Sequence, residues 1–243
     1  MPDNELDALR EHPFPQGQVA AMRDAAWMMD EPVDELVVAA TEDDAADPDV
    51  RRADPPPPAH AIAAAVRGLP GATIVAIDGA GGSGKTTVAA AVAALLDGAT
   101  IVHGDDFYRP MPEPERERLS AEEGYWRYFD WERLRDEVLA PLHAGRPARY
   151  RSYDWETGDL GPWHEIAAGT VVVVEGVYTA RPELARYYGL TAYVDTPRET
   201  CLRRVRDRGE NPPEWIARWR AAEDHYIRTT APQTRADMVV RGD

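Results

Sequence analysis

Short aliphatic and β-branched runs alternate with helical stretches from about residue 59 onward. Residues 73–77 predict a buried strand, which leads into a glycine-rich turn and then into a helix over residues 86–96. Further strand-like runs lie at residues 100–103, 171–174, 191–194 and 238–240. Strands and helices that alternate along a chain form a mainly parallel sheet between two layers of helices. The pattern therefore predicts a three-layer α/β domain with a five-stranded sheet.

Residues 1–58 differ in composition from the rest of the chain. They hold fifteen acidic residues against four arginines, so most of the formal charge of −16 belongs to this segment. Four consecutive prolines at residues 55–58 favour an extended spacer over a helix. We expect residues 1–58 to be an acidic, largely disordered extension with a proline-rich linker, and residues 59–243 to form the folded domain.

The charge and the apolar pattern narrow the function classes. An acidic chain lacks the positive surface that non-specific nucleic-acid or anionic-membrane binding requires. No apolar run reaches the roughly 18 residues of a membrane span, and the first residues are acidic where a signal peptide is basic. Cys201 is the only cysteine, which excludes a disulfide framework. We expect a cytoplasmic protein without nucleic-acid or membrane partners, and the sequence leaves a homo-oligomer open.

One eight-residue stretch carries the strongest functional signal. Residues 79–86 fit G-x-x-x-x-G-K-[ST] between the first predicted strand and the first predicted helix. Glycines let backbone N–H groups surround phosphate oxygens, Lys85 reaches the β and γ phosphates, and the Thr86 hydroxyl binds Mg²⁺. Lys85 is the only lysine among 27 basic residues, which favours a specific task for it. The candidate nucleotide-binding residues are Gly79, Ala80, Gly81, Gly82, Ser83, Gly84, Lys85, Thr86 and Thr87.

The same stretch also satisfies a weaker pattern. Gly79, Gly81 and Gly84 fit G-x-G-x-x-G, and Asp105 follows about twenty residues later, as in a dinucleotide-binding fold. That alternative gives Lys85 no task, whereas the phosphate-loop interpretation does. We therefore favour the P-loop NTPase fold.

Acidic residues follow two of the predicted strands. Asp105 and Asp106 come directly after the run at residues 100–103, and Glu175 ends the run at residues 171–174. Open α/β sheets bind ligands at the carboxyl ends of their strands. Phosphoryl transfer to an alcohol needs a carboxylate that accepts the hydroxyl proton, and anionic ligands for Mg²⁺. We predict Asp105 as the catalytic base, with Asp106 as the alternative, and Thr86, Asp105 and Glu175 around Mg²⁺.

A short arginine-rich helix is expected near residue 200. Thr196 and Asn211 each precede a proline and a glutamate three residues later, which predicts the N-caps of two helices. Leu202 and Val205 would face the sheet, so that arginines point outward as a lid that neutralises charge on the transferred phosphoryl group. The arginines of this lid are Arg203, Arg204, Arg206 and Arg208, and the predicted catalytic ones are Arg203, Arg206 and Arg208.

With these residues placed, residues 72–240 resemble the uridine kinase-like branch of P-loop kinases, which includes phosphoribulokinase, pantothenate kinase and nicotinamide riboside kinase. The similar stretches are residues 79–86, 105–108, 129–131, 153–155, 175–177 and 203–208, in the order of that family. The resemblance implies an ATP- and Mg²⁺-dependent kinase in which Asp105 is the base and Thr86 and Glu175 help to hold Mg²⁺. The residues expected to contact the acceptor are Asp106, Tyr108, Asp130 and Tyr153.

Two departures from the family pattern concern the acceptor. Uridine-cytidine kinases carry a histidine five residues after the tyrosine of their Tyr-Asp-Phe motif, where this chain has Gly158, with His164 nearby. The segment between the two predicted caps is also short and contains Pro212 and Pro213. Our first expectation for the acceptor is a nucleoside 5′-hydroxyl, and nicotinamide riboside, pantothenate or a phosphosugar are the alternatives. A nucleotide-binding regulatory module, with a partner docked on residues 1–58, is the hypothesis from a different class.

Overall fold

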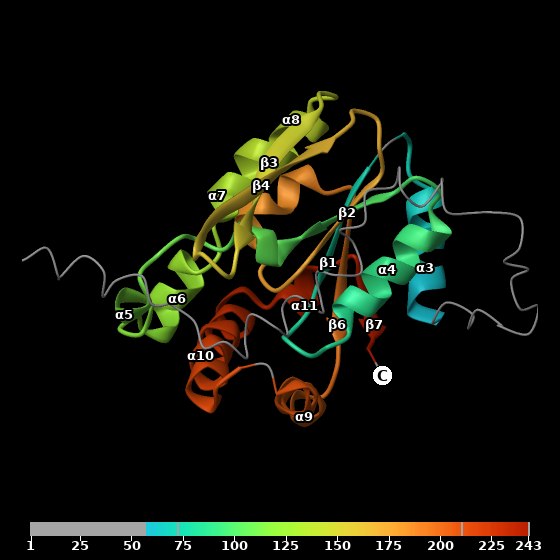
Figure 1. Ribbon diagram of the computed structural model, residues 1–243. Helices are drawn as coiled ribbons and strands as arrows, with labels where there is room; N and C mark the ends of the chain where they lie inside the picture. The colour runs from blue at the N-terminus through green and yellow to red at the C-terminus, as the bar shows by residue number, and fades with distance from the viewer. Residues whose placement is uncertain (1–56, 72, 210, 243) are drawn as a thin grey trace, which may run out of the picture.

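A parallel five-stranded sheet forms the centre of the protein (Figure 1). The computed structural model describes residues 57–71, 73–209 and 211–242. The strands run in the order β2-β5-β1-β6-β7, and every neighbouring pair is parallel. Their bounds are β1 (Ile74–Asp78), β2 (Thr100–His103), β5 (Val172–Glu175), β6 (Leu190–Asp195) and β7 (Met238–Arg241). This arrangement confirms the predicted α/β fold, and each predicted strand lies within two residues of its expected bounds.

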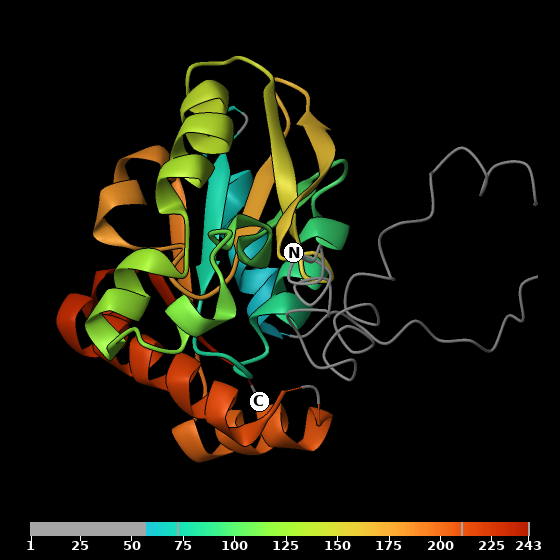
Figure 2. The ribbon, with the colours of Figure 1, turned by 60° about the vertical axis from the view of Figure 1, so that its left-hand side comes forward.

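Each face of the sheet packs against its own hydrophobic cluster. On one face, Val75, Ile77 and Val173 pack with residues of α3 (Pro57–Arg67) and α4 (Lys85–Leu95). On the other face, Val172 and Val174 pack in a second cluster that includes residues of α6 (Ala121–Arg127), η3 (Leu134–Leu139) and α10 (Pro213–Thr230). Successive side chains of a strand point to opposite faces, so β5 contributes to both clusters. Figure 2 shows the helices on both sides of the sheet.

Most of the helices are short and lie between β2 and the hairpin of β3 (Ala148–Asp154) and β4 (Asp159–Ile166), or after β5. Those before the hairpin are η2 (Gly104–Phe107), α5 (Glu113–Arg116), α6 (Ala121–Arg127), α7 (Trp131–Arg133), η3 (Leu134–Leu139) and α8 (Ala140–His143). Those after it are η4 (Pro182–Tyr187), α9 (Arg198–Arg208), α10 (Pro213–Thr230) and α11 (Pro232–Arg235). Helix α10 packs along α6 (Figure 1).

Helix α3 begins inside the proline run that we expected to be a linker. Pro57 opens the helix because proline fits the first helical turn, where its missing N–H is not needed. The expected start of the domain at residue 59 thus falls within α3. The expected extension lies outside the described residues except for Pro57 and Pro58, so its disorder stays a prediction.

A two-stranded antiparallel hairpin was not predicted from the sequence. It consists of β3 (Ala148–Asp154) and β4 (Asp159–Ile166) and projects beside the sheet (Figure 1). Strand β3 buries Tyr150 and Tyr153 but carries an arginine on each side of Tyr150, and the pairing register shifts between Arg151 and Tyr153. Such strands lack the β-branched runs that indicate a strand in a sequence.

Both predicted helix caps are wrong. Helix α9 begins after Pro197, and the Thr196 hydroxyl donates to the carbonyl of Ser83 (2.8 Å) in the glycine-rich loop instead of capping the helix. Helix α10 begins after Pro212, and Asn211 makes no side-chain cap there. Thr196 therefore braces the loop that precedes α4.

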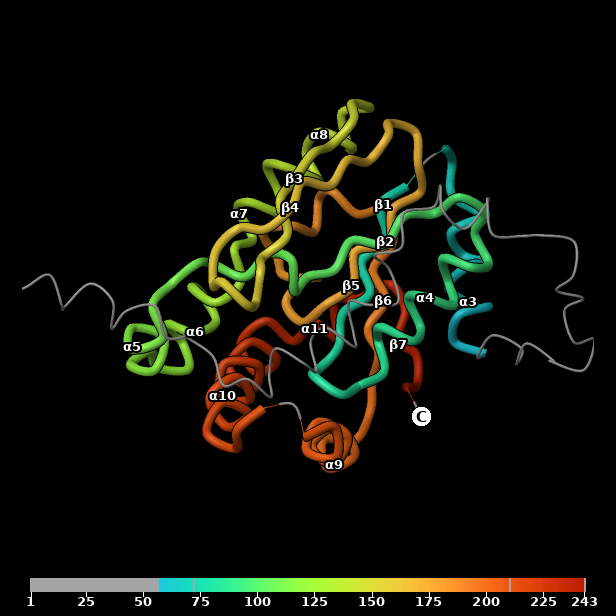
Figure 3. Tube along the Cα trace, in the orientation of Figure 1, coloured from blue at the N-terminus to red at the C-terminus, as the bar shows by residue number. Residues whose placement is uncertain are grey.

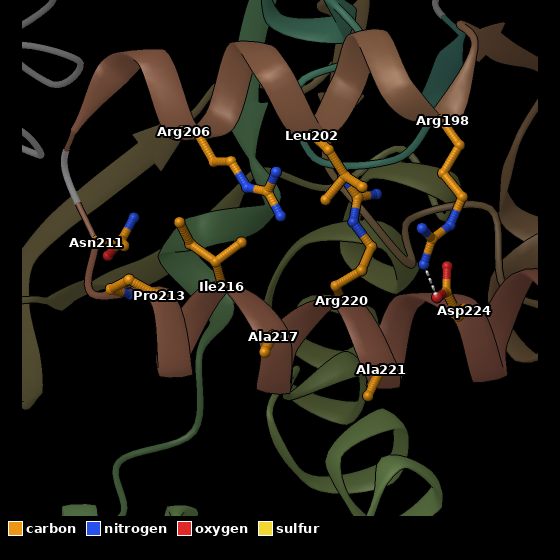
Figure 4. Close-up of a pocket in the computed structure, with 10 residues that line it drawn as sticks. All are labelled: Arg198, Leu202, Arg206, Asn211, Pro213, Ile216, Ala217, Arg220, Ala221 and Asp224. Carbon is orange, nitrogen blue, oxygen red and sulfur yellow. Dashed lines mark hydrogen bonds and ion pairs between the residues drawn. The ribbon is translucent and has the colours of Figure 1, made fainter.

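The Leu202 side chain does not face the sheet as we expected. It lines a cleft of about 510 Å³ between α9 and α10 together with Arg206, Ile216 and Arg220 (Figure 4). In the described ranges 57–71, 73–209 and 211–242, no helix has the length and apolar character that crossing a membrane requires.

Candidate active site

The glycine-rich loop at residues 79–84 joins the carboxyl end of β1 to the start of α4 (Figure 3). Gly82 and Gly84 have φ values of 82° and 93°, a left-handed conformation that favours glycine. Three consecutive loop carbonyls accept hydrogen bonds from side chains that follow β6 in the chain. The pairs are Gly81 with Arg220 (3.2 Å), Gly82 with Arg204 (3.4 Å) and Ser83 with Thr196 (2.8 Å). These bonds hold the carbonyls on the outer side of the loop.

Several backbone N–H groups of the loop are left to bind an anion. Within the described part of the chain, the N–H groups of Gly82, Gly84 and residues 85–87 donate to no protein acceptor. The first N–H groups of a helix have no partner within the helix, and they carry its partial positive charge. A phosphate chain suits this cradle.

A carboxylate, a hydroxyl and an imidazole meet beside the start of α4. The Thr86 hydroxyl donates to Glu175 Oε2 (3.2 Å), and His103 Nδ1 lies 2.8 Å from Glu175 Oε1. Burial alone would raise the pKa of Glu175, but the hydrogen bond with His103 and the charge of Lys85 bring it below its usual value. An ionised carboxylate next to a hydroxyl is a donor set that suits Mg²⁺.

Asp105 lies in η2, directly after β2, where the charges of Lys85 and Glu175 act on its carboxylate. The Asp105 side chain is exposed to solvent. Partial desolvation by the surrounding protein raises the pKa of Asp105, the charges of Lys85 and Arg208 oppose the rise, and the charge of Glu175 adds to it. The structure therefore brings the predicted base, the lysine and the predicted Mg²⁺ carboxylate together.

Asp106 faces the hairpin. Its Oδ2 accepts a hydrogen bond from the Tyr150 hydroxyl (3.1 Å), and its carbonyl accepts one from Arg133 (2.6 Å). Burial raises the pKa of Asp106, against the opposing charges of His103 and His164. Because Tyr150 holds its carboxylate, Asp106 is a weaker candidate for the base than Asp105.

Aromatic rings gather around Tyr108 and Tyr153, two of the predicted acceptor contacts, and we call this part of the site the acceptor side. The Trp155 ring lies 4.7 Å from Tyr108 and 4.8 Å from Tyr153, and Trp219 of α10 lies 6.3 Å from Tyr108 and 6.1 Å from Trp155. We call these four residues the aromatic wall. Sequence reasoning did not include Trp155 and Trp219 in the site, because they come from segments that are far apart in the chain.

Two predicted acceptor contacts already have protein partners. Asp130 caps α7 by accepting from the N–H of Arg133 (3.3 Å), and it also pairs with Arg109 (3.1 Å). The Tyr153 hydroxyl accepts from Arg116 (3.3 Å), whose side chain is buried. Their contact with an acceptor stays a prediction.

The predicted lid arginines lie on α9 with different surroundings. Arg203, Arg206 and Arg208 are exposed, and Arg206 lines the cleft between α9 and α10 (Figure 4). The charge of Arg208 acts on Asp105, whereas Arg204 bonds to the loop and to the carbonyl of Gly242 (2.8 Å). Their catalytic role stays a prediction.

The hairpin explains why Gly158 stands where uridine-cytidine kinases have histidine. Gly158 has a φ of 70° in the turn between β3 and β4, and its N–H donates to the carbonyl of Asp154 (2.8 Å). A left-handed turn position favours glycine. His164 lies on β4, stacked on Tyr150 (5.0 Å) and bonded to the Ser152 hydroxyl (3.1 Å).

Asp78, which sequence reasoning missed, organises the base of the loop. It is fully buried and accepts hydrogen bonds from the N–H of Gly79 (2.6 Å), the N–H of Ala180 (2.8 Å) and the Tyr226 hydroxyl (2.7 Å). Burial raises its pKa to about 6, against the lowering effect of these bonds. Its position at the end of a strand, directly before the glycines, was the signal that could have found it.

The fold and the loop define a P-loop protein with the α/β architecture of the P-loop kinases. A family model described as Phosphoribulokinase / Uridine kinase family matches residues 74–242, which is more than half of the chain. The chain therefore belongs to this family.

Relatives and solved structures are similar over the same part. The chain is 27% identical over 163 residues to a uridine kinase of Saccharomyces cerevisiae, with 60% of this chain and 32% of that protein covered. It is 28% identical over 166 residues to a uridine kinase of Borreliella burgdorferi, with 65% and 77% covered. The chain thus spans about a third of the length of the yeast relative.

Two solved structures share the fold. One is described as a possible uridine kinase from Bacillus stearothermophilus, with a TM-score of 0.61, 24% identity, and 75% of this chain and 96% of that chain covered. The other is phosphoribulokinase from Rhodobacter spheroides, with a TM-score of 0.51, 17% identity, and 70% of each chain covered.

Proposed function

We propose that the protein is an ATP- and Mg²⁺-dependent kinase that transfers the γ-phosphoryl group to a hydroxyl of a small molecule, with a nucleoside as the first acceptor class. Family membership supports the kinase chemistry, and the relatives named uridine kinase support the acceptor class. The observation that carries the proposal is the position of Asp105, whose carboxylate lies within the field of Lys85 beside the phosphate cradle.

The loop binds the triphosphate. The free N–H groups of Gly82, Gly84 and the first turn of α4 surround the phosphate oxygens, and Lys85 neutralises their charge. Thr86 and Glu175 would hold Mg²⁺, which supplies charge neutralisation on the β and γ phosphates when it is bound. Positioning and charge stabilisation carry most of the catalysis of such transfers.

Asp105 accepts the proton of the acceptor hydroxyl. The hydroxyl oxygen bonds to the γ-phosphorus while the bond from that phosphorus to the β–γ bridging oxygen breaks, and ADP leaves with that oxygen. Only ionised Asp105 can accept the proton. Because partial desolvation raises the pKa of Asp105, the acid limb of kcat/KM should lie at higher pH than an ordinary aspartate would give.

The aromatic wall supports an acceptor with a flat ring. Stacking of a base on aromatic side chains is worth about 1–3 kcal/mol per base, and it does not depend on base identity. Residue 158 is glycine and not histidine, which argues against the recognition of a pyrimidine base in the way that uridine-cytidine kinases use.

A second acceptor class is favoured by one observation. The Arg116 guanidinium is buried beside the Tyr153 hydroxyl and pairs with Glu113 (Nε to Oε2, 3.4 Å), while its Nη1 has no hydrogen-bond partner within the described residues. A buried cationic donor suits a carboxylate or phosphate, as in pantothenate or a phosphosugar.

ADP formation against a panel of acceptors tests the proposal. Purified protein with Mg²⁺ and ATP would be measured with nucleosides, nicotinamide riboside, pantothenate and sugar phosphates. We expect at least one nucleoside to raise ADP release well above the rate without acceptor. A panel in which none does so, while ATP still binds, would contradict kinase activity and favour the regulatory module.

A further inference from the structure

One ion pair of α10 binds both backbone polar groups of Gly81, its N–H and its carbonyl. The N–H of Gly81 donates to Glu223 Oε2 (3.3 Å), and its carbonyl accepts from Arg220 Nη2 (3.2 Å). Arg220 Nη1 donates to the same Oε2 of Glu223 (2.9 Å). The two side chains are only 8% and 12% exposed, so water screens this pair weakly.

Glycine at residue 81 of the loop fits the position of this ion pair. A Cβ atom on residue 81 would lie 2.9 Å from Glu223 Oε1, closer than such contacts allow. Glycine at this position therefore leaves room for the carboxylate. Because the N–H of Gly81 donates to Glu223, the first free N–H group for phosphate in this part of the loop is that of Gly82.

The same helix contacts the acceptor side. Trp219 belongs to the aromatic wall, one residue before Arg220 and one helical turn before Glu223. Glu223 also lies within the field of Lys85, and its charge acts on Tyr108. Helix α10 thus contacts the wall through Trp219 and the phosphate loop through Arg220 and Glu223.

We propose that Arg220 and Glu223 are positioning residues. They hold the glycine-rich loop in the position that lines up the bound γ-phosphate with the acceptor side. They fix the direction of the Gly81 peptide, and through it the following amides point inward. Without the pair, Lys85 and the amides still bind nucleotide, but the γ-phosphorus shifts relative to the acceptor. This role goes beyond the proposed function because it holds for any acceptor.

A neighbouring ion pair is the matched control. Arg198 of α9 pairs with Asp224 of α10 across one end of the cleft (Figure 4). Asp224 follows Glu223 directly in the chain, but its side chain is 38% exposed and pairs with Arg198. Replacing Asp224 changes the same helix without contact to the loop.

The experiment compares Glu223→Met and Arg220→Gln with Asp224→Met, and adds Glu223→Gln as a conservative variant that keeps an acceptor for the N–H of Gly81. For each protein, kcat, KM for ATP and the Kd of Mg²⁺-ADP are measured. Backbone hydrogen exchange is followed in the peptide that covers residues 79–86.

We expect Glu223→Met and Arg220→Gln to lower kcat about 10- to 100-fold, because small misplacements of reacting groups cost this much. The KM for ATP and the Kd of Mg²⁺-ADP should stay within about threefold, since the amides and Lys85 remain. Exchange in the loop peptide should accelerate. Glu223→Gln should recover part of the loss, and Asp224→Met should match the unchanged protein.

Two outcomes would overturn the proposal. In the first, Glu223→Met and Arg220→Gln behave as Asp224→Met does in kcat and loop exchange. In the second, kcat, nucleotide affinity and thermal stability fall together, which indicates general destabilisation. If no acceptor is phosphorylated by the unchanged protein, the proposed function fails. Loop exchange and Mg²⁺-ADP binding then decide the role of the pair, and unchanged exchange would overturn it.

Discussion

The phosphate loop and the acceptor side are built in different ways. The loop and the first two residues of α4 form one continuous stretch, residues 79–86, and side chains from later segments hold the loop carbonyls at Gly81, Gly82 and Ser83. The acceptor side has no such continuous stretch, because its aromatic wall draws Tyr108, Trp155 and Trp219 from three segments. We therefore expect the loop to serve any phosphate chain and the choice of acceptor to depend on the wall.

The largest expected effect is at the loop. Lys85→Ala removes the cation that neutralises the phosphates, and we expect kcat/KM for ATP to fall about 10³-fold, since a single preorganised donor is worth this much. Steady-state kinetics with the best acceptor would measure it.

Lys85→Arg is the matched variant. A planar guanidinium does not replace a compact ammonium in a tight ring of amides, so it should recover little of the activity. Full activity of Lys85→Arg, with an unchanged melting temperature, would contradict the assignment of a point charge at this position.

The next effect concerns the base of the loop and is a stability effect. Burial raises the pKa of Asp78 to about 6, so Asp78 takes up its proton more readily in the folded protein than in the unfolded chain. Its contribution to stability is present at low pH and is lost as pH rises through about 6. Between pH 4.5 and 7.5, the difference in unfolding free energy between the unchanged protein and Asp78→Asn should fall by about 2 kcal/mol.

Urea unfolding of both proteins at these two pH values would measure this change. Asparagine does not titrate, so other groups cancel in the difference. A difference that stays constant with pH would show that Asp78 is not the titrating group.

The smallest effect is expected at the aromatic wall. Trp155→Ala removes a ring that contacts Tyr108 and Tyr153, and we expect the KM of a nucleoside acceptor to rise about tenfold while the KM for ATP stays constant. Trp163→Ala is the control, because Trp163 on β4 is 54% exposed and outside the wall. Equal effects of the two variants would remove Trp155 from the acceptor site.

The same contrast explains how much could be predicted from the sequence. The sheet was predictable because its central strands β1 and β5 are aliphatic runs, as at residues 172–174. The loop was predictable because its glycines and Lys85 stand close together in the chain. The hairpin was not predictable from the sequence, because β3 mixes buried tyrosines with arginines. The caps at Thr196 and Asn211 were wrong because a local pattern does not show that the Thr196 hydroxyl has a partner in the distant loop.

Long-range partners also explain the residues that were missed. Asp78 and Glu223 each act through hydrogen bonds to residues about a hundred or more positions away, at Ala180, Tyr226 and Gly81. Asp130 and Tyr153 were predicted as acceptor contacts, while the structure gives them Arg109 and Arg116 as partners. Side-chain pairing across the fold is set by topology, and a single sequence does not report it.

Asp105→Asn offers the most direct measurement, because asparagine keeps the shape of the side chain and cannot accept the proton. The turnover number with the best acceptor and the Kd of Mg²⁺-ADP would be determined for both proteins. We expect the turnover number to fall about 10²- to 10⁴-fold while the Kd stays within about threefold. Turnover retained at the level of the unchanged protein, or nucleotide binding lost together with turnover, would contradict the role of Asp105 as the base beside the phosphate cradle.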